Sequence, residues 1–427
     1  MSDSSDVLII GGGVAGLAAA GILGQAGLTV TLLEARHRLG GRIITVSTPS
    51  GPVELGAEFI HGEPPPSLER ARKYSLELAE RYGSSWCMNQ HLHPCNFEEE
   101  PYEYLSALTH YNGPDISFTE YLERFPPRSL EVRASVVRFV EGFNAADKEK
   151  IGVHFLIQEQ KSSDEIDGDR LLTFKNGYGA LVAAMCKDLA RDVRVHLNEP
   201  VRELRWSKDA VTAISTNQAE YSAKRAVITV PVSLLKGPHK LRFSPELPAK
   251  EAAAEPIIMG SALRITFEFR DRFWASSTNT RPAMPDLSFL LSEHEEVFPV
   301  WWTQHPTRNT LLTGWVGGPT AMRLARFSER ELSAMAMNSL CRIFGDTLQD
   351  QLVATHYHDW QADPWSLGAY SYVATGGMDA PLALAKPVEE TLFFAGEATN
   401  SEGRSATVDG AITTGERAAK EVLDSLR

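Results

Sequence analysis

The sequence predicts an α/β fold in which a Rossmann-like domain is interleaved with an α+β domain of mixed sheet and helices. The first observation is that residues 7–62 read as strand, glycine turn, helix, strand and glycine-rich loop. The second is that an apolar strand, a glycine turn and a helix return between residues 392 and 419. The third is the length of 427 residues, which exceeds what one hydrophobic core usually supports. If the last segment rejoins the first, the Rossmann-like domain is discontinuous.

The interior of the chain alternates helical and strand patterns. The apolar positions of residues 130–145 suit an amphipathic helix. We also expect helices over 177–190 and 328–344, and strands over 193–207, 210–216, 223–231, 262–269, 309–317 and 357–361. His356 and His358 would share one face of a strand, and because no third ligand is evident, no metal site is predicted.

These patterns divide the chain into two interleaved domains. The ββα-type, Rossmann-like domain is expected at residues 1–65, 170–238 and 376–427, and the α+β domain at 66–169 and 239–375. Neither an internal repeat nor a low-complexity linker is visible, so the division rests on the return of the first pattern at the end of the chain.

The composition describes a globular protein with an acidic balance. Hydrophobic residues make up 43% of the chain, and the formal net charge is −13. This charge argues against a general nucleic-acid-binding surface and would mildly attract cationic substrates. No stretch approaches the ~18 apolar residues that a membrane span needs. We therefore expect neither a nucleic acid nor a membrane as a partner.

Cysteine usage bears on the compartment. Cys87, Cys95, Cys186 and Cys341 are scattered, without CxxC spacing. Such spacing favours neither a disulfide framework nor a zinc cluster, so reduced thiols are expected. Because the first residues are polar and acidic and do not resemble a signal peptide, we expect a cytoplasmic protein.

A glycine motif follows the first strand. Gly11, Gly13 and Gly16 form GxGxxG at the start of the first helix. The first glycine permits a tight turn, the second lets backbone approach a pyrophosphate, and the third lets the helix pack on the sheet. Glu34 ends the next strand, where a carboxylate accepts hydrogen bonds from both ribose hydroxyls and would repel a 2′-phosphate. The segment predicts a dinucleotide site that disfavours NADP and does not separate NAD from FAD.

A second glycine turn lies just beyond the strand that ends at Glu34. It is formed by Gly40 and Gly41 and is flanked by Arg36 and Arg42. Guanidinium groups suit a phosphate or the edge of a flavin. The turn therefore favours FAD over NAD.

The C-terminal segment offers a matching half-site. A strand ends in Gly396 and Glu397, and a helix begins near Thr407 and Val408. A helix start aimed at the pyrimidine side of a flavin would stabilise negative charge on the reduced ring. By itself, this segment reads more simply as a sheet-edge strand and a surface helix.

Taken together, these motifs resemble the flavin-containing amine oxidase family, which includes monoamine oxidases, polyamine oxidases and the lysine-specific histone demethylase. The matching pieces follow the family order over nearly the whole chain: GGGVAGLAAA, EARHRLGGRI, VELGAEFIHG, LTFKNGYGALVAAM, AVITVPVSLLK, RDRFW, DPWSLGAYSYVATGG, LFFAGEAT and ATVDGAITTGERAA. DPWSLGAYSY and SATVDGA are more like the polyamine oxidase and demethylase branches. The resemblance implies an FAD cofactor, a small-molecule amine substrate and O2.

The resemblance carries the cofactor contacts over position by position. It implies that FAD is held by Gly11, Gly13, Gly16, Glu34, Arg36, Gly41, Arg42, Gly396 and Glu397. Val201 matches a position whose backbone contacts adenine, and the Val408 N–H would lie near the flavin. Ala369 stands where monoamine oxidases carry the cysteine that bonds the flavin. Noncovalent FAD is therefore expected.

The same resemblance names candidates for the substrate side. Tyr370 matches one wall of the family's aromatic sandwich in front of the flavin, while Thr407 replaces the second aromatic wall. Trp302 or Trp315 is a candidate to complete it, although tryptophans are more often ordinary core residues.

His61 matches a position near the cavity, where it would orient a cationic amine or take its proton; a structural role is the alternative. Glu58 and Glu63 flank it and would add attraction for positive charge. Arg264 stands where the family has a lysine bridged by water to the flavin N5. Arginine keeps the charge but is bulkier and does not deprotonate, which argues against fast reaction with oxygen. The candidate catalytic residues are thus Tyr370, Arg264, His61, Thr407 and Trp302.

The leading hypothesis is oxidation of an amine at the C–H bond next to nitrogen, with hydride transfer to flavin N5, imine hydrolysis to an aldehyde, and reoxidation by O2 to give hydrogen peroxide. A second hypothesis keeps FAD but makes the protein an amino-acid oxidase, a desaturase or an isomerase of the same fold, with Arg264 as a carboxylate clamp. A third is a flavin-binding protein without catalysis.

Overall fold

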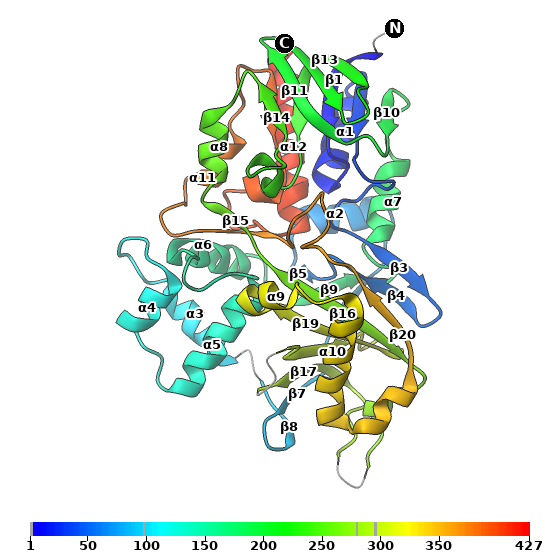
Figure 1. Ribbon diagram of the computed structural model, residues 1–427, viewed down its shortest axis with the longest axis vertical. Helices are drawn as coiled ribbons and strands as arrows, with labels where there is room; N and C mark the ends of the chain where they lie inside the picture. Colours follow the sequence, from blue (N-terminus) through cyan, green and yellow to red (C-terminus); the bar gives the residue numbers. More distant parts are fainter. Residues whose placement is uncertain (1–2, 97–98, 279–280, 294–296) are drawn as a thin grey trace.

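The computed structural model describes residues 3–96, 99–278, 281–293 and 297–427. Figure 1 shows both chain ends at one end of an elongated molecule, beside the sheet that contains the first strand. A second sheet lies at the opposite end, and a group of helices flanks it. The α/β fold class with an interleaved α+β part is confirmed.

The first sheet has eight strands. Its order is β10 (Val193–His196), β2 (Val30–Leu33), β1 (Asp3–Ile10), β13 (Glu220–Ile228), β12 (Ala210–Ser215), β11 (Val201–Ser207) and β14 (Arg242–Ser244), with β22 (Leu392–Phe394) also paired to β13. The strands β10, β2, β1, β13 and β22 run parallel, whereas β12 is antiparallel to both β13 and β11. The carboxyl ends of β1, β2, β13 and β22 therefore meet at one edge, as expected where a dinucleotide binds.

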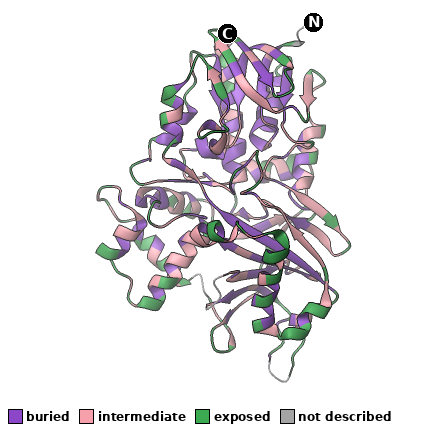
Figure 2. Ribbon diagram, viewed as in Figure 1, coloured by how far each residue is buried: buried purple, intermediate pink, exposed green. Residues whose placement is uncertain are grey.

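Two helices from opposite ends of the chain pack together on this sheet. These are α1 (Val14–Gln25) and α12 (Val408–Ser425), and α7 (Gly179–Lys187) lies beside α1. A Cβ on Gly415 of α12 would lie 2.2 Å from the carbonyl oxygen of Ala15, so only glycine permits this close approach. The contact joins the two end segments that the sequence paired, and Figure 2 shows this region largely buried.

The second large sheet has seven strands. Its order is β20 (Leu352–Tyr357), β16 (Ala262–Phe269), β19 (Leu311–Gly317), β18 (Val300–Thr303), β17 (Leu287–Ser292), β7 (Ser84–Met88) and β8 (Leu92–Pro94). Helix α10 (Glu329–Phe344) packs on it and begins with a capping box, in which Ser328 and Glu331 bond each other's backbone. A helical group follows the first strands of this sheet: α3 (Glu99–Leu108), α4 (Phe118–Arg124), α5 (Leu130–Phe143) and α6 (Val153–Asp164).

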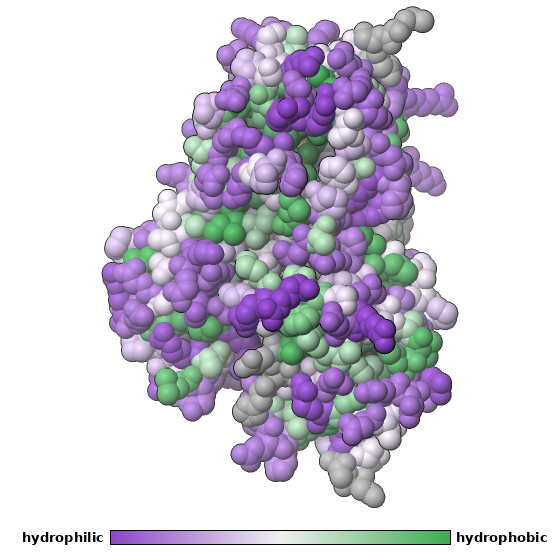
Figure 3. Space-filling model, viewed as in Figure 1, coloured by the Kyte–Doolittle hydropathy of each residue, from purple (hydrophilic) through white to green (hydrophobic). Residues whose placement is uncertain are grey.

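The remaining strands and α-helices of the described residues are short. They are β3 (Thr45–Thr48) paired with β4 (Gly51–Glu54), the sheet of β5 (Ile60–His61), β9 (Leu171–Phe174) and β6 (Leu78–Arg81), β15 (Ile257–Met259) paired with β21 (Ser371–Val373), and the helices α2 (Pro65–Lys73), α8 (Pro248–Ala254), α9 (Gly318–Leu324) and α11 (Ala380–Ala385). Figure 3 shows hydrophilic side chains over most of the face in view. None of the helices in the described ranges is long and apolar enough to span a bilayer.

Two expectations about local structure are wrong. A strand was expected over 357–361, but the observed strand β20 ends at Tyr357. His358 therefore lies beyond the strand and does not share a strand face with His356. The expectation of reduced thiols fails as well, because Cys87 and Cys95 form a disulfide across the β7–β8 hairpin, while Cys186 and Cys341 are free. Pairing across a hairpin of this kind gives no CxxC spacing, which is why the sequence did not reveal it.

The domain boundaries stay a prediction. Residues near the expected boundary at 239 still belong to the first sheet, since β14 pairs with β11. The apolar side of α8 joins the same core through Ala253 and Ala254. Both elements lie within the range that the sequence assigned to the second domain.

Candidate active site

One cavity of about 560 Å³ runs between the two large sheets. It begins at the carboxyl ends of β1 and β2 and reaches the residues of β16, β18 and β19. Every predicted cofactor-binding and catalytic residue lines it except Gly16, and Glu63 does not line it either. A Cβ on Gly16 would lie 2.0 Å from the carbonyl oxygen of Gly11, so this glycine lets α1 pack against the turn and does not face the cavity.

The start of α1 is open toward this cavity. The helix begins at Val14 with Gly13 as its N-cap, and no side chain caps it. The nearest atom to a Cβ built on Gly13 is a Gly41 Cα at 3.9 Å, so space remains in front of the helix. Uncapped N–H groups and the positive end of a helix dipole bind phosphate. These features fit the pyrophosphate of a dinucleotide.

Glu34 is placed as a ribose acceptor. It is 4% exposed, and its two oxygens accept from the backbone N–H groups of Gly12 at 2.7 Å and Arg36 at 2.8 Å. Each carboxylate oxygen has a further lone pair, which is free to accept from a hydroxyl. The backbone bonds fix the carboxylate at the cavity edge before any ligand binds.

Glu199 is a cavity residue that sequence reasoning missed. Its Oε2 lies 3.3 Å from the Asn217 amide donor, but its Oε1 is buried and has no partner. The backbone N–H of Glu199 bonds to Glu34 O, so the two carboxylates belong to one end of the cavity, together with Val201. A buried acceptor without a donor costs about 1–3 kcal/mol, which a ligand hydroxyl or amine would offset. The only sequence signal was its position in LNEPV, beside Val201.

The two predicted cofactor arginines are held by acidic partners. Arg36 donates to Asp363 at 2.7 Å and to Ser366 at 2.8 Å. Burial opposes ionisation of Asp363, but its bond from His358 and the charge of Arg36 outweigh that effect and lower its pKa to about 2. Asp363 is therefore an anion at neutral pH, and the guanidinium of Arg36 is fixed at the cavity wall.

Arg42 is paired with Glu397. One nitrogen of Arg42 donates to Glu397 at 2.9 Å and to the Ala369 carbonyl at 2.9 Å. The other oxygen of Glu397 accepts from Ser371 at 2.6 Å and from the Ala406 N–H at 2.9 Å. This cluster ties the second glycine turn to the C-terminal segment, two parts of the chain that are over 350 residues apart.

Thr407 is the N-cap of α12. Its hydroxyl accepts from the Gly410 N–H at 2.9 Å and donates to the Arg404 carbonyl at 2.8 Å. The hydroxyl is thus committed to capping, and Val408 begins the helix at the cavity wall. A part for Thr407 in the reaction stays a prediction.

Two parallel aromatic rings form one part of the cavity wall. The rings of Tyr370 and Trp315 differ by 7° in orientation, with centroids 6.5 Å apart, whereas Trp302 is tilted by 47° to Trp315. The last carbonyls of α5 anchor both rings, since Trp315 donates to Gly142 at 2.9 Å and Tyr370 to Phe143 at 2.6 Å. Helix ends leave such carbonyls without helical partners. Trp315, rather than Trp302, is therefore the ring parallel to Tyr370.

A buried ion cluster surrounds Glu58. This carboxylate bonds Arg264 at 2.5 Å, lies 3.4 Å from Arg81, and accepts from the Trp302 indole at 3.0 Å. Burial works against its ionisation, but the two guanidinium groups outweigh that effect and lower the pKa of Glu58. One carboxylate between two arginines leaves a net positive charge. The Nε of Arg264 is buried without a partner, and its guanidinium carbon lies 5.4 Å from the Trp302 ring centre.

These pairings correct the expectation that Glu58 and Glu63 attract a cationic substrate. Glu58 is committed to the two arginines, and Glu63 bonds Arg170 on the surface. Neither carboxylate is free to receive an ammonium group.

His61 is buried among aromatic rings. Its ring lies edge-on to Phe143, with centroids 5.3 Å apart, and the centroid of the Phe59 ring is 6.2 Å away. Burial disfavours the charged imidazolium and lowers the pKa of His61 to about 4. His61 is therefore neutral at pH 7, which excludes the charged form as a general acid there.

Glu159 of α6 is the second residue that sequence reasoning missed. It lines the cavity and accepts from the Asn144 amide at 2.6 Å. Burial raises its pKa to about 8, and the nearby charge of Glu397 acts in the same direction. Glu159 is mostly protonated at pH 7. In the sequence it is one of several polar residues in IQEQK, and nothing there marks it as facing a cavity.

Comparison with known proteins matches the chain to flavin-dependent amine oxidoreductases. Residues 14–423 match the family model described as flavin containing amine oxidoreductase. The chain is 30% identical to lysine-specific histone demethylase 1 homolog 3 of Arabidopsis thaliana, over all of this chain but 30% of that protein. It is 29% identical to polyamine oxidase 4 of Oryza sativa subsp. japonica, over 97% of this chain and 88% of that protein. The chain thus spans less than a third of the first of these two relatives.

Solved structures share the fold. Putrescine oxidase, in its wild-type form bound to putrescine, superposes with a TM-score of 0.83 at 22% identity and covers 99% of each chain. Cyclohexylamine oxidase from Brevibacterium oxydans IH-35A gives a TM-score of 0.83 at 23% identity, again over 99% of each chain. At these identities the likeness is one of fold.

Proposed function

The chain belongs to the flavin containing amine oxidoreductase family, and on this premise we propose that it is an FAD-dependent amine oxidase. Its substrate would be a small-molecule amine, oxidised at the carbon next to nitrogen. The imine would be hydrolysed to an aldehyde, and O2 would be reduced to hydrogen peroxide. Putrescine oxidase, cyclohexylamine oxidase and polyamine oxidase, with which the chain shares fold or sequence, suggest an aliphatic amine.

The residues at the first sheet fit the adenosine and phosphate part of FAD. The open start of α1 would hold the pyrophosphate, while Glu34 and the unpaired oxygen of Glu199 would accept from ribose or adenine donors. Arg36, Arg42 and Glu397 line the path to the second sheet and would hold the remainder. Val408 would present the N-terminus of α12 to the ring system. When bound, the flavin supplies the site that accepts hydride from the substrate and passes two electrons to O2.

The observation that carries the proposal is that this cofactor path continues into a compartment walled by aromatic rings. Tyr370 and Trp315 stand parallel there, His61 is neutral, and the cluster of Glu58 with its two arginines is net positive. Such surroundings disfavour an ammonium ion and favour the neutral amine. Only the neutral amine has a nitrogen lone pair that assists departure of hydride from the adjacent carbon. These residues would thus lower the pKa of the substrate amine by desolvation, so that it reacts in its neutral form.

Anaerobic titration of the purified holoprotein tests the proposal. We expect aliphatic amines such as putrescine and cyclohexylamine to bleach the flavin absorbance, and admission of O2 to restore it with formation of peroxide. Trp315→Phe should weaken amine reduction, whereas Trp206→Phe, at a half-buried tryptophan of β11 that lies outside the cavity lining, should not. Failure of every amine to reduce the flavin would refute amine oxidation and favour the flavin-binding protein without catalysis.

The amino-acid oxidase alternative gains no support from the cavity. It needs an arginine to clamp the substrate carboxylate, and Arg264 is already bonded to Glu58 and to the Gly56 carbonyl. Comparing flavin reduction by amines with reduction by free amino acids separates the two reactions. No described contact favours a desaturase or an isomerase.

The mode of flavin attachment, the location in the cell and the absence of nucleic-acid binding stay proposals. The methyl side chain of Ala369 has no nucleophilic atom that could bond a flavin, so FAD should be released when the protein is denatured with acid. The predicted cytoplasmic location remains, although the Cys87–Cys95 disulfide removes the argument from reduced thiols. The exclusion of nucleic acid rests only on the charge of −13.

A further inference from the structure

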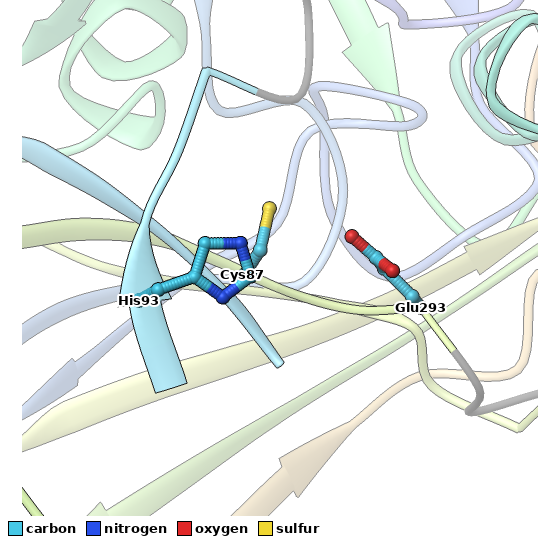
Figure 4. Close-up of side chains that lie close together, drawn as sticks. All are labelled: Cys87, His93 and Glu293. Carbon is cyan, nitrogen blue, oxygen red and sulfur yellow. The ribbon is translucent and has the colours of Figure 1, made fainter. Parts of the chain in front are cut away.

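The β7–β8 hairpin brings together side chains that could hold a metal ion. Cys87 in β7 lies opposite His93 in β8, and Cys95 follows His93 by two positions. Residues two apart in an extended segment face the same side, so His93 and Cys95 share the face of Cys87. Glu293 comes directly after β17, whose Leu291 pairs with Cys87. Figure 4 shows Cys87, His93 and Glu293 turned toward one another.

Geometry and bonding suit these side chains to coordination. One ligand atom each from Cys87, His93 and Glu293 can be chosen so that all lie within 4.8 Å of one another. In a tetrahedral zinc site, bonds of about 2.0–2.3 Å place ligand atoms roughly 3.5 Å apart, so a modest closing movement suffices. His93 Nδ1 lies 3.1 Å from the His91 carbonyl and must donate to it, which leaves Nε2 as the ligand atom.

The structure contains the oxidised form of this hairpin, in which the sulfur of Cys87 is bonded to Cys95. Reduction of that disulfide would provide two thiolates, whereas the disulfide provides no thiolate ligand. Strand pairing holds the backbone of Cys87, and the Cys95 N–H donates to the Ser85 carbonyl at 3.0 Å, so both backbones stay in place with a Cα–Cα distance of 5.7 Å. The reduced hairpin then presents two sulfurs, one imidazole and one carboxylate, a set that suits Zn²⁺ in number and chemistry.

We propose that the Cys87–Cys95 disulfide and a Zn²⁺ site made of Cys87, His93, Cys95 and Glu293 are two alternative states of the β7–β8 hairpin. A phosphine reductant in water donates two electrons to the disulfide, leaving two thiols and a phosphine oxide that takes its oxygen from the water. Zn²⁺ then displaces the two thiol protons and binds both thiolates. Oxidation of the thiolates to the disulfide by a two-electron oxidant would release the ion.

This hairpin lies beside the wall of the large cavity. Leu291, the strand partner of Cys87, lines the cavity, and so does Arg138, which donates to the Glu293 carbonyl at 3.2 Å. Exchange between the disulfide and the zinc-bound state would therefore change the structure next to the compartment proposed for the amine. The zinc proposal itself does not depend on amine oxidation, because it is tested by metal binding.

Metal binding to the purified holoprotein tests the proposal. The protein is treated with a phosphine, which leaves no competing thiol, then desalted without oxygen and dialysed against Zn²⁺. We expect one tightly bound zinc per chain after reduction and none in the untreated protein. Co²⁺ in place of Zn²⁺ should give a thiolate-to-metal absorption band and the strong visible bands of a tetrahedral site.

Variants identify the ligands. His93→Ala and Glu293→Gln should each weaken zinc binding in the reduced protein about tenfold or more. The paired substitution Cys87→Ser and Cys95→Ser should abolish it. His91→Ala is the matched control, because His91 offers only its backbone carbonyl, and Cys186→Ser should also bind zinc normally.

Two results would overturn the proposal. One is the absence of bound zinc in the reduced wild-type protein, a comparison that needs no variant to fold. The other is undiminished binding in the Cys87→Ser, Cys95→Ser protein, which would place the ion elsewhere.

Discussion

Replacing Glu58 by glutamine tests the buried ion cluster most directly. The Glu58 side chain is 5% exposed, and those of Arg264 and Arg81 are 6% and 4% exposed. Glutamine keeps the size and can still accept from the Trp302 indole, but it leaves two buried guanidinium groups without a counter-charge. Removing one partner of a buried ion pair costs about 3–5 kcal/mol. At ~2–4 °C per kcal/mol for a domain of 150–250 residues, the melting temperature should fall by ~6–20 °C.

The matched control is Glu63→Gln. Glu63 is half-exposed and pairs with Arg170, itself 39% exposed, so the loss should be no more than about 1 kcal/mol. Thermal unfolding of both holoproteins, followed by circular dichroism, makes the comparison. Because the folded-state pKa of Glu58 is depressed, its contribution is present above the unfolded pKa and is lost as pH falls through the folded value. A Glu58→Gln loss no larger than that of Glu63→Gln, or one that persists unchanged in acid, would refute the cluster as described.

Four further outcomes are expected. Burial raises the pKa of Glu159 from 4.5 to about 8, so folding becomes less favourable as pH rises from 4.5 to 8. Relative to Glu159→Gln, the wild-type free energy of unfolding should fall on the order of 5 kcal/mol over this range, as measured by urea unfolding at a series of pH values. Glu34→Gln should weaken FAD binding about tenfold, measured by flavin fluorescence, because it replaces one oxygen acceptor by a donor. Tyr370→Phe should lower the melting temperature slightly through loss of its ~1 kcal/mol bond to Phe143 while retaining flavin reduction by amines. Arg264→Lys should speed flavin reoxidation in stopped-flow experiments, and an unchanged rate would show that arginine does not limit the reaction with O2.

The sequence predicted the fold well where residues close together in the chain determine the structure. The strand, glycine turn, helix and acid of residues 7–34 act over short distances, so their periodicity and spacing were sufficient. The pairing of the two chain ends was also predicted, because both repeat one pattern, and the close contact of Gly415 with Ala15 shows its physical basis.

The candidate site was predicted at the cofactor end and only partly at the other. Trp315 takes the position parallel to Tyr370 because the end of α5 offers carbonyls to both side chains, a contact between residues 173 positions apart. Glu159 faces the cavity because α6 turns it there, and its neighbours in sequence are equally polar. Cys87 and Cys95 pair because β7 and β8 align. Each of these facts depends on tertiary contacts that no local pattern contains.

The charges around the aromatic compartment bear on how an amine would enter it. The exterior is acidic overall, which attracts ammonium ions, while the interior cluster of Glu58, Arg81 and Arg264 is net positive and repels them. Neither His61, which titrates near pH 4, nor Glu159, which is mostly protonated at pH 7, is suited to take the proton there. We therefore expect the proton to leave the amine for solvent before or during entry. On this reasoning the ionisation of the substrate itself, rather than that of His61, governs how fast amine is oxidised as pH rises.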